Sequence, residues 1–206
     1  MYNGSDAYFL AVVIGYFVGS IPTAYWVAQH AQQTDIRTIG EGNVGARNVF
    51  HVVSHRWGVV TFLGDFLKGV VVAVIYRNQP SWLFFTAGFA LFLGHAWPVW
   101  LKFTGGKGVS TVGGFAATLT PLSTILGAAV AGPVWLVTRR FIPTLVSIIV
   151  VALALAPVFD ISWQYLVVIV VLFICTGLKR LIDEPRMRQI EASSGWERVG
   201  GIAKPK

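Results

Sequence analysis

Long hydrophobic stretches alternate with short polar loops along most of this chain. A stretch of about 18 or more apolar residues is long enough to cross the hydrocarbon core of a bilayer as a helix. The apolar region 109–138 is too long for one helix, and Thr120–Pro121 lies near its middle. Because the residue before a proline is biased away from the α conformation, we expect two helices there. The pattern predicts seven helices, at 8–28, 58–76, 82–101, 109–119, 121–138, 141–159 and 163–178.

The composition favours an all-α polytopic membrane protein over a soluble domain. Of the 206 residues, 55% are hydrophobic and 12% are charged, whereas a soluble domain carries about 25% charged residues. No basic segment precedes the first apolar stretch, and Gly19–Pro22 interrupts that stretch rather than ending it. We therefore expect no cleavable signal peptide. The single cysteine, Cys175, excludes an intramolecular disulfide, and we expect no metal site.

Basic residues lie mainly in the loops between the hydrophobic stretches, and the formal net charge is +7. This placement favours anionic lipid headgroups and membrane topology over a nucleic-acid partner. Seven crossings put nearly all of these cations on one side, with Arg77 as the only basic loop residue opposite. Because cytoplasmic loops are enriched in Lys and Arg, we expect the N-terminus outside and the C-terminus in the cytoplasm.

The predicted helices form one unit in the chain. We expect a single integral-membrane domain at 1–182, in which the helix at 109–119 is too short to cross the bilayer completely. The segment 183–206 is polar and carries Gly and Pro. We expect it to be a loosely ordered cytoplasmic tail.

The stretch Gly94–Thr111, GHAWPVWLKFTGGKGVST, is the most informative part of the chain. The glycines of Gly105–Gly108 let the backbone approach an anion closely, and Lys107 adds a positive charge. Ser110 and Thr111 follow where a helix is expected to begin, and a helix N-terminus attracts anions. The P-loop spacing is absent. The hypothesis is therefore a phosphate held at the membrane surface, with a flexible connector as the alternative.

A second loop on the same side, Asp35–Asn48, reads DIRTIGEGNVGARN. Its glycines and asparagines are typical of tight turns, and Arg37 and Arg47 carry planar guanidinium groups suited to phosphate or carboxylate. We interpret this loop as a functional one, because it shares its side of the membrane with the GGKG loop. An ordinary connecting loop that caps a helix at Asn48 is the alternative.

Several polar residues fall inside the hydrophobic stretches. Asp65 and Lys68 are three residues apart, so they share one helix face. Ionisable residues at membrane depth are costly and often functional, but a structural ion pair between helices is equally consistent with this spacing. His95 either donates to or deprotonates a substrate or satisfies a backbone carbonyl, and the second interpretation is favoured. Ser20 and Pro22 predict a kinked first helix rather than a nucleophilic serine.

These motifs resemble those of the bacterial PlsY family, the acyl-phosphate:glycerol-3-phosphate acyltransferases. The resemblance rests on GSIPTAYWVA at 19–28, DIRTIGEGNVGARN at 35–48, GDFLKG at 64–69 and GHAWPVWLKFTGGKGVST at 94–111. It implies a seven-helix protein of the bacterial inner membrane with a site that faces the cytoplasm. It also implies transfer of a fatty acyl group from acyl phosphate to the 1-hydroxyl of glycerol 3-phosphate, giving lysophosphatidic acid, without a metal or organic cofactor.

The resemblance further implies roles for individual residues and partners. The expected partners are acyl phosphate, glycerol 3-phosphate and membrane lipids, and the oligomeric state stays open. The expected catalytic residues are Arg37, Lys107 and His95. The expected substrate-binding residues are Asn43, Asn48, Lys68, Gly105, Gly106, Gly108, Ser110 and Thr111.

The sequence departs from the usual family pattern at a few positions. Glu41 stands where the family has a serine and Arg47 where it has a threonine, and we expect these two residues to pair. Near the end of the last predicted helix, this chain has Ile174 and Gly177 where the family has a His and an Asn. These departures motivate an alternative: a non-catalytic or repurposed relative that binds a phosphorylated lipid or regulates a partner enzyme. A small transporter is a third hypothesis.

Overall fold

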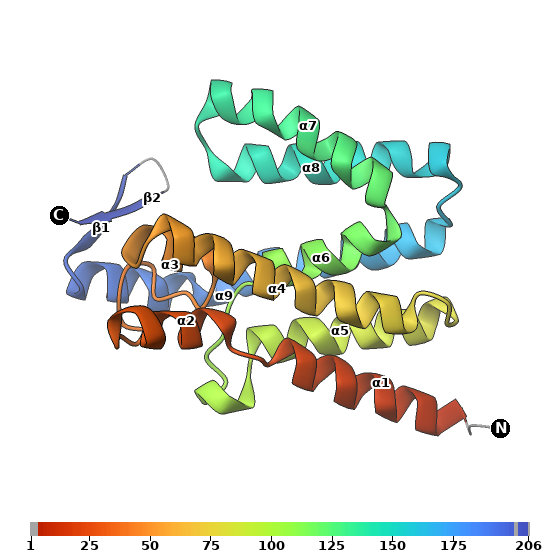
Figure 1. Ribbon diagram of the computed structural model, residues 1–206, viewed down its shortest axis with the longest axis horizontal. Helices are drawn as coiled ribbons and strands as arrows, with labels where there is room; N and C mark the ends of the chain where they lie inside the picture. The colour runs from red at the N-terminus through yellow and green to blue at the C-terminus, as the bar shows by residue number, and fades with distance from the viewer. Residues whose placement is uncertain (1–3, 200–201, 206) are drawn as a thin grey trace.

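The computed structural model describes residues 4–199 and 202–205 and is almost entirely helical (Figure 1). Its helices are α1 (Gly4–Gly19), α2 (Thr23–Gln32), α3 (Ala46–Val52), α4 (His55–Tyr76), α5 (Ser81–Ala96), η1 (Val99–Leu101), α6 (Val109–Leu119), α7 (Pro121–Thr138), α8 (Phe141–Leu155), η2 (Ala156–Phe159) and α9 (Trp163–Ser193). In the described part of the chain, six helical segments are long and apolar enough to cross a membrane, and α6 is a shorter apolar helix. The predicted all-α membrane fold with about seven helices is confirmed.

Local sequence explains where the helices begin and end. Pro22 has no N–H and cannot continue a helix, so α1 and α2 are separate segments of the first apolar stretch. Pro121 occupies the first turn of α7 after a non-helical Thr120, which confirms the predicted break. Ser54 caps α4, since its hydroxyl accepts a hydrogen bond from the Trp57 N–H.

The helices that carry the site pack with their backbones in close contact. A Cβ at Gly69 on α4 would collide with the carbonyl oxygen of Thr111 on α6, and a Cβ at Gly114 would collide with that of Phe66. Small residues at such positions let membrane helices approach closely. The buried apolar core beside this contact includes Phe84, Leu91, Phe115 and Leu172.

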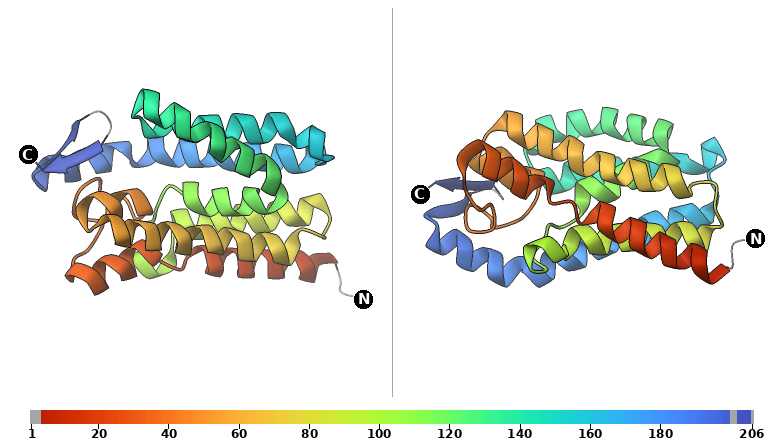
Figure 2. Two further views of the ribbon diagram at one scale, coloured as in Figure 1. Left: turned by 45° about the horizontal axis from the view of Figure 1, so that its top comes forward. Right: turned by 60° about the horizontal axis from the view of Figure 1, so that its bottom comes forward.

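The elements are distributed unevenly along the molecule. α2 and α3 lie at the end opposite the N-terminus, together with the C-terminal strands β1 (Trp196–Val199) and β2 (Ile202–Pro205), which pair antiparallel (Figure 1). α7 and α8 pack mainly against each other and form a hairpin beside the other helices (Figure 2). The 35–48 loop, which joins α2 to α3, therefore lies at the end of the helical body away from the N-terminus.

The C-terminal segment differs from the prediction. α9 continues to Ser193, so the first part of the predicted tail, 183–193, is helical and not loosely ordered. The continuation is held by a buried face at four-residue spacing. It consists of Lys179, Asp183, Met187 and Glu191. Residues four apart share one helix face, so these four side chains form a single buried stripe along α9.

Candidate functional site

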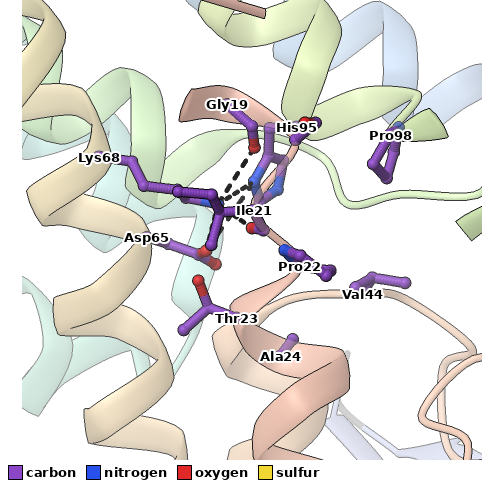
Figure 3. A pocket seen from close by; sticks show the side chains of 11 residues that line it. Gly19, Ile21, Pro22, Thr23, Ala24, Val44, Asp65, Lys68, His95 and Pro98 are labelled. Carbon is purple, nitrogen blue, oxygen red and sulfur yellow. Dashed lines mark hydrogen bonds and ion pairs between the residues drawn. The ribbon is translucent and has the colours of Figure 1, made fainter. Parts of the chain in front are cut away.

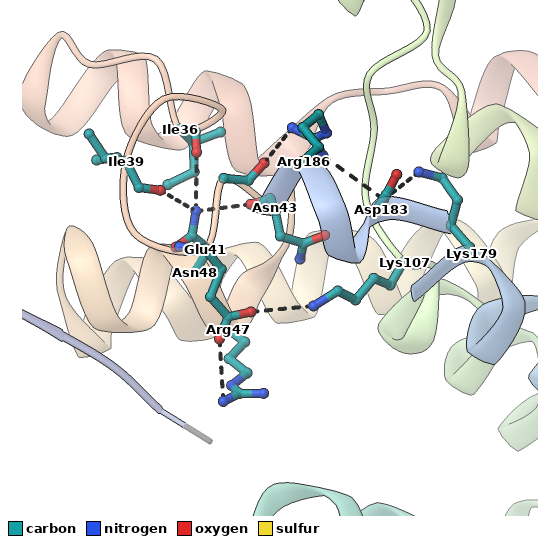
Figure 4. Close-up of polar contacts among 11 residues, drawn as sticks. Ile36, Ile39, Glu41, Asn43, Arg47, Asn48, Lys107, Lys179, Asp183 and Arg186 are labelled. Atoms are coloured by element: carbon teal, nitrogen blue, oxygen red, sulfur yellow. Dashed lines mark hydrogen bonds and ion pairs between the residues drawn. The ribbon is translucent and has the colours of Figure 1, made fainter. Parts of the chain in front are cut away.

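The two glycine-rich loops meet in the structure. The Lys107 ammonium nitrogen lies 3.3 Å from Oε2 of Glu41, so an ion pair joins the GGKG loop to the 35–48 loop (Figure 4). The backbones also touch, since a Cβ at Gly106 would collide with the Val44 carbonyl oxygen. The loops therefore form one structure, as their shared side of the membrane predicted.

The glycines of the GGKG loop serve tight packing within the protein. A Cβ at Gly105 would collide with the His95 carbonyl oxygen, and the Gly106 N–H donates a hydrogen bond to that same oxygen at 3.1 Å. Gly108 has φ +84°, a conformation that favours glycine, and it caps α6 at its N-terminus. The Gly106 N–H already donates to a protein group. The N–H groups that an anion could reach are therefore those of the first turn of α6, which have no partner within the helix.

Asn48 holds the 35–48 loop together from inside. Its side chain is fully buried, and its amide nitrogen donates to the carbonyl oxygens of Ile36, Ile39 and Asn43, each at 3.1 Å. Its amide oxygen accepts from the Glu41 N–H at 3.0 Å. All of these contacts are with the loop backbone, so Asn48 shapes the wall of the site instead of pointing at a ligand.

Glu41 lies between two cations. Its carboxylate is 2% exposed, and its oxygens lie 3.3 Å from the Lys107 ammonium and 3.3 Å from Nη2 of Arg47. The expected pairing of Glu41 with Arg47 is confirmed. Burial lowers the pKa of Lys107, whereas the Glu41 carboxylate acts in the opposite direction and favours the charged ammonium. The Arg47 guanidinium also stacks over the ring of Phe141 at 5.4 Å.

Arg37 folds back on its neighbour in the loop. Its guanidinium donates to both carboxylate oxygens of Asp35, with Nη2 at 2.6 Å from Oδ2, and donates to the Leu101 carbonyl oxygen at 3.0 Å. This contact holds the pKa of Asp35 below its ordinary value. Arg37 lines an open depression of about 460 Å3 together with Arg186, Thr38 and Thr104. Arg37 therefore combines a structural contact with exposure at the loop surface.

A second polar cluster lies deeper, between α4, α5 and α6 (Figure 3). Lys68 contacts Asp65 at 2.8 Å and donates to the carbonyl oxygens of Ile21 at 2.9 Å and Gly19 at 3.3 Å. These oxygens belong to the break between α1 and α2, where a helix end leaves carbonyls without intrahelical partners. The cluster lines a cavity of about 10 Å3, room for about one water. Lys68 thus makes the interhelical structural contact that the spacing allowed.

His95 connects this cluster to the GGKG loop. Its Nδ1 lies 3.1 Å from the Thr111 hydroxyl and 3.4 Å from the Lys68 ammonium. An ammonium can only donate, so Nδ1 accepts and we assign the ring proton to Nε2. Nε2 is the atom next to the GGKG loop, since a Cβ at Gly106 would collide with it. His95 therefore presents a fixed N–H donor toward that loop.

The other candidate residues divide by burial. Asn43 is 5% exposed, and its buried amide oxygen has no hydrogen-bond partner. Ser110 is half-buried in the first turn of α6, and Thr111 is fully buried against His95. Ser20 donates to the Phe17 carbonyl oxygen at 3.0 Å, which agrees with the kinked-helix interpretation.

α9 contributes residues that the sequence analysis did not single out. Arg186 donates to the Gly42 carbonyl oxygen at 3.2 Å, and Ile190 packs against Gly42. Lys179 pairs with Asp183 and lies 5.0 Å from the ring centre of Trp97. The four-residue spacing from Lys179 onward was the signal in the sequence that could have identified this face of α9.

At the two positions that depart from the family pattern, Ile174 is 55% exposed, and a Cβ at Gly177 would meet no atom within 4 Å.

Comparisons with known proteins agree on one family. The family model described as glycerol-3-phosphate acyltransferase matches residues 9–183. The glycerol-3-phosphate acyltransferase of Hyphomonas neptunium is 44% identical over 130 residues, which make up 63% of this chain and 61% of that protein. The one from Brucella anthropi is 35% identical over 183 residues, which make up 84% of this chain and 89% of that protein.

A solved structure shares the fold. The crystal structure of PlsY, an integral membrane glycerol 3-phosphate acyltransferase in its glycerol 3-phosphate form, matches with a TM-score of 0.72 and 28% identity. The match covers 88% of this chain and 92% of that one. The resemblance to PlsY inferred from the motifs is confirmed, and this chain belongs to the glycerol-3-phosphate acyltransferase family.

Proposed function

We propose that this protein transfers a fatty acyl group from acyl phosphate to the 1-hydroxyl of glycerol 3-phosphate, giving lysophosphatidic acid. Its relatives are named for glycerol 3-phosphate, and PlsY was solved in a form named for that molecule. We place the protein in the bacterial inner membrane with the N-terminus outside. The polar end that holds both loops then faces the cytoplasm, where the excess of basic residues is expected.

One observation carries this proposal. The Lys107 ammonium lies at the start of α6, pairs across to Glu41 of the second loop, and is 13% exposed. A lysine beside the first turn of a helix combines a positive charge with free N–H groups, which is the arrangement that phosphate oxygens prefer. Lys107 is therefore the residue we assign to the phosphate.

The chemistry requires positioning and charge stabilisation. The acceptor hydroxyl oxygen attacks the acyl carbonyl carbon, and the bond from that carbon to the phosphate oxygen breaks. Inorganic phosphate leaves and takes the hydroxyl proton, so the protein needs no covalent intermediate and no strong base. Lys107 and Arg37 neutralise the phosphate charges, and the His95 Nε2–H donates to a substrate oxygen.

The remaining candidate residues take different roles in this proposal. Asn43 faces the ligand, because its buried amide oxygen has no partner in the described structure. Asn48, Lys68 and Thr111 are assigned as positioning residues, because their polar atoms contact protein groups. The acyl chain is expected to lie against lipid-facing helices.

A product assay tests the proposal. Full-length protein in lipid nanodiscs is mixed with an acyl phosphate and a panel of phosphorylated polyols, and mass spectrometry detects the acylated product. We expect lysophosphatidic acid from glycerol 3-phosphate, and rescue of cells that lack their own acyltransferase. Well-folded protein that yields no acylated product and no rescue would overturn the proposal in favour of a binding or regulatory relative.

A further inference from the structure

Glu41 occupies the position on Lys107 that an anionic ligand needs. Its two oxygens bridge Lys107 and Arg47 at 3.3 Å each (Figure 4). Phosphate oxygens bridge cations in the same way, since both groups are anions whose oxygens accept hydrogen bonds from several donors. The Glu41 carboxylate therefore lies where a bound phosphoryl group would contact Lys107.

The backbone of the loop directs Glu41 inward. Gly40 and Gly42 have φ values of +60° and +61°, so the chain turns on both sides of Glu41. The Glu41 N–H is fixed at the same time by the Asn48 amide oxygen at 3.0 Å. These contacts fix the backbone of Glu41, so its side chain starts from a point beside Lys107 and Arg47. The backbone conformation of the loop therefore positions Glu41 for its contact with Lys107.

The surrounding charge favours a second anion. Lys107 and Arg47 both contact Glu41, and Arg180 lies near enough to lower the pKa of Lys107 further. Positive charge is thus gathered around Lys107, which favours the binding of an anion there. The amide oxygen of Asn43, on the same loop, is buried without a partner. A ligand that brings negative charge and donors would meet both features.

We propose that Glu41 is an internal counterion that competes with substrate phosphate for Lys107 and thereby sets the affinity of the site for anions. Phosphate binds by displacing the carboxylate from Lys107, while Arg47 retains it. The inference rests on the proposed function only in taking Lys107 as the phosphate-binding residue. This competition weakens the binding of a free dianion such as inorganic phosphate. A ligand that makes further contacts with the site can still bind.

The test measures binding of inorganic phosphate and of glycerol 3-phosphate to full-length protein in nanodiscs by titration calorimetry. We expect Glu41→Gln and Glu41→Ser to lower the Kd for both anions about tenfold, because the competing charge is gone. The gain should vanish when Lys107→Ala is added. Glu184→Gln, which removes a carboxylate paired with Arg188 on α9, controls for net charge and should leave the Kd unchanged.

Thermal unfolding provides an independent measurement. It separates a variant that folds poorly from one that folds but binds anions differently. Without phosphate, Glu41→Gln leaves Lys107 and Arg47 without their shared carboxylate and should melt below the wild type. Added phosphate should raise its melting temperature more than that of the wild type, because the ligand binds the folded state only. Equal or weaker anion binding in both Glu41 variants, with no added stabilisation by phosphate, would overturn the counterion role.

The two proposals fail in different ways. Product formation by the wild type together with unchanged anion binding in the Glu41 variants removes the counterion role and leaves the acyltransferase. Tighter phosphate binding in the variants, together with no acylated product from the wild type, removes the acyltransferase and keeps the counterion.

Discussion

Two of the buried charge clusters in the described part of the chain differ in how their charges are matched. In the deeper one, Lys68 contacts Asp65 and two backbone carbonyls, so each of its contacts is a protein group. In the loop cluster, Glu41 is shared between Lys107 and Arg47. In the deeper cluster one cation pairs with one carboxylate, whereas in the loop cluster two cations share Glu41, an arrangement that an added anion can complement. The comparison separates structural ionisable residues from binding ones better than burial alone.

The largest expected effect follows from the loop cluster. Lys107→Ala should reduce product formation by about a hundredfold or more, because one charge that stabilises the reacting phosphate is lost. The variant should keep its helical circular dichroism, since Glu41 still pairs with Arg47. Lys102→Ala serves as the control, because Lys102 is an exposed lysine in the turn before the same loop. Equal turnover of Lys107→Ala and Lys102→Ala would contradict the site assignment.

The deeper cluster should respond in the opposite manner. Lys68→Ala should destabilise the protein by about 3–5 kcal/mol, because it leaves the Asp65 carboxylate buried without its cation. Thermal unfolding in nanodiscs measures this loss. The double variant Asp65→Ala/Lys68→Ala should recover part of it, since no unpaired charge remains. A Lys68→Ala protein of normal stability and impaired turnover would show that Lys68 acts on substrate instead.

Asn48 provides an intermediate effect within the loop. Asn48→Ala should cost about 2 kcal/mol or more, because it leaves several buried backbone groups of the loop without partners. Hydrogen exchange should show faster opening of residues 35–48, and the KM for the acceptor should rise as the wall loses its shape. Exchange at α7 gives an internal reference, since that helix packs mainly against α8. Unchanged exchange in 35–48 would refute the bracing role.

The smallest expected effect concerns the partly buried ion pair of Asp35 with Arg37. The pKa of Asp35 is lowered in the folded protein, so its contribution to stability is present above its unfolded pKa and is lost as the pH falls through the folded value. For a pair within one loop that solvent still reaches, we expect about 1 kcal/mol or less. Melting temperatures of the wild type and Asp35→Asn should therefore differ at pH 6 and converge in strong acid. A difference that grows below pH 4 would contradict this assignment.

The helical architecture could be predicted from the sequence to a large extent. The apolar lengths and the prolines at 22 and 121 were sufficient to place the membrane helices and the break between α6 and α7. The glycines of the two loops indicated tight turns and a candidate anion-binding site in these segments. The helical extension of α9 was missed, because a polar stripe at four-residue spacing is typical of a solvated surface unless a partner covers it.

Within the site, the sequence identified residue types and left their partners undetermined. It marked Asn48, Lys68 and Thr111 as candidates for ligand contact, whereas the structure directs their polar atoms toward protein groups. It anticipated the pairing of Glu41 with Arg47 but not the contact of Glu41 with Lys107.

The sequence by itself determined that this chain is a bundle of apolar helices joined by polar loops. Hydrophobic length, proline and glycine act locally, so a linear pattern reveals them. Only the tertiary structure decided which carboxylate faces which cation. Such pairs depend on segments such as Glu41 and Lys107, which are distant in the chain and meet only when the helices pack. The energy of a buried charge depends on which partner it meets after packing. Whether it stabilises the fold or binds a ligand depends on the same partner.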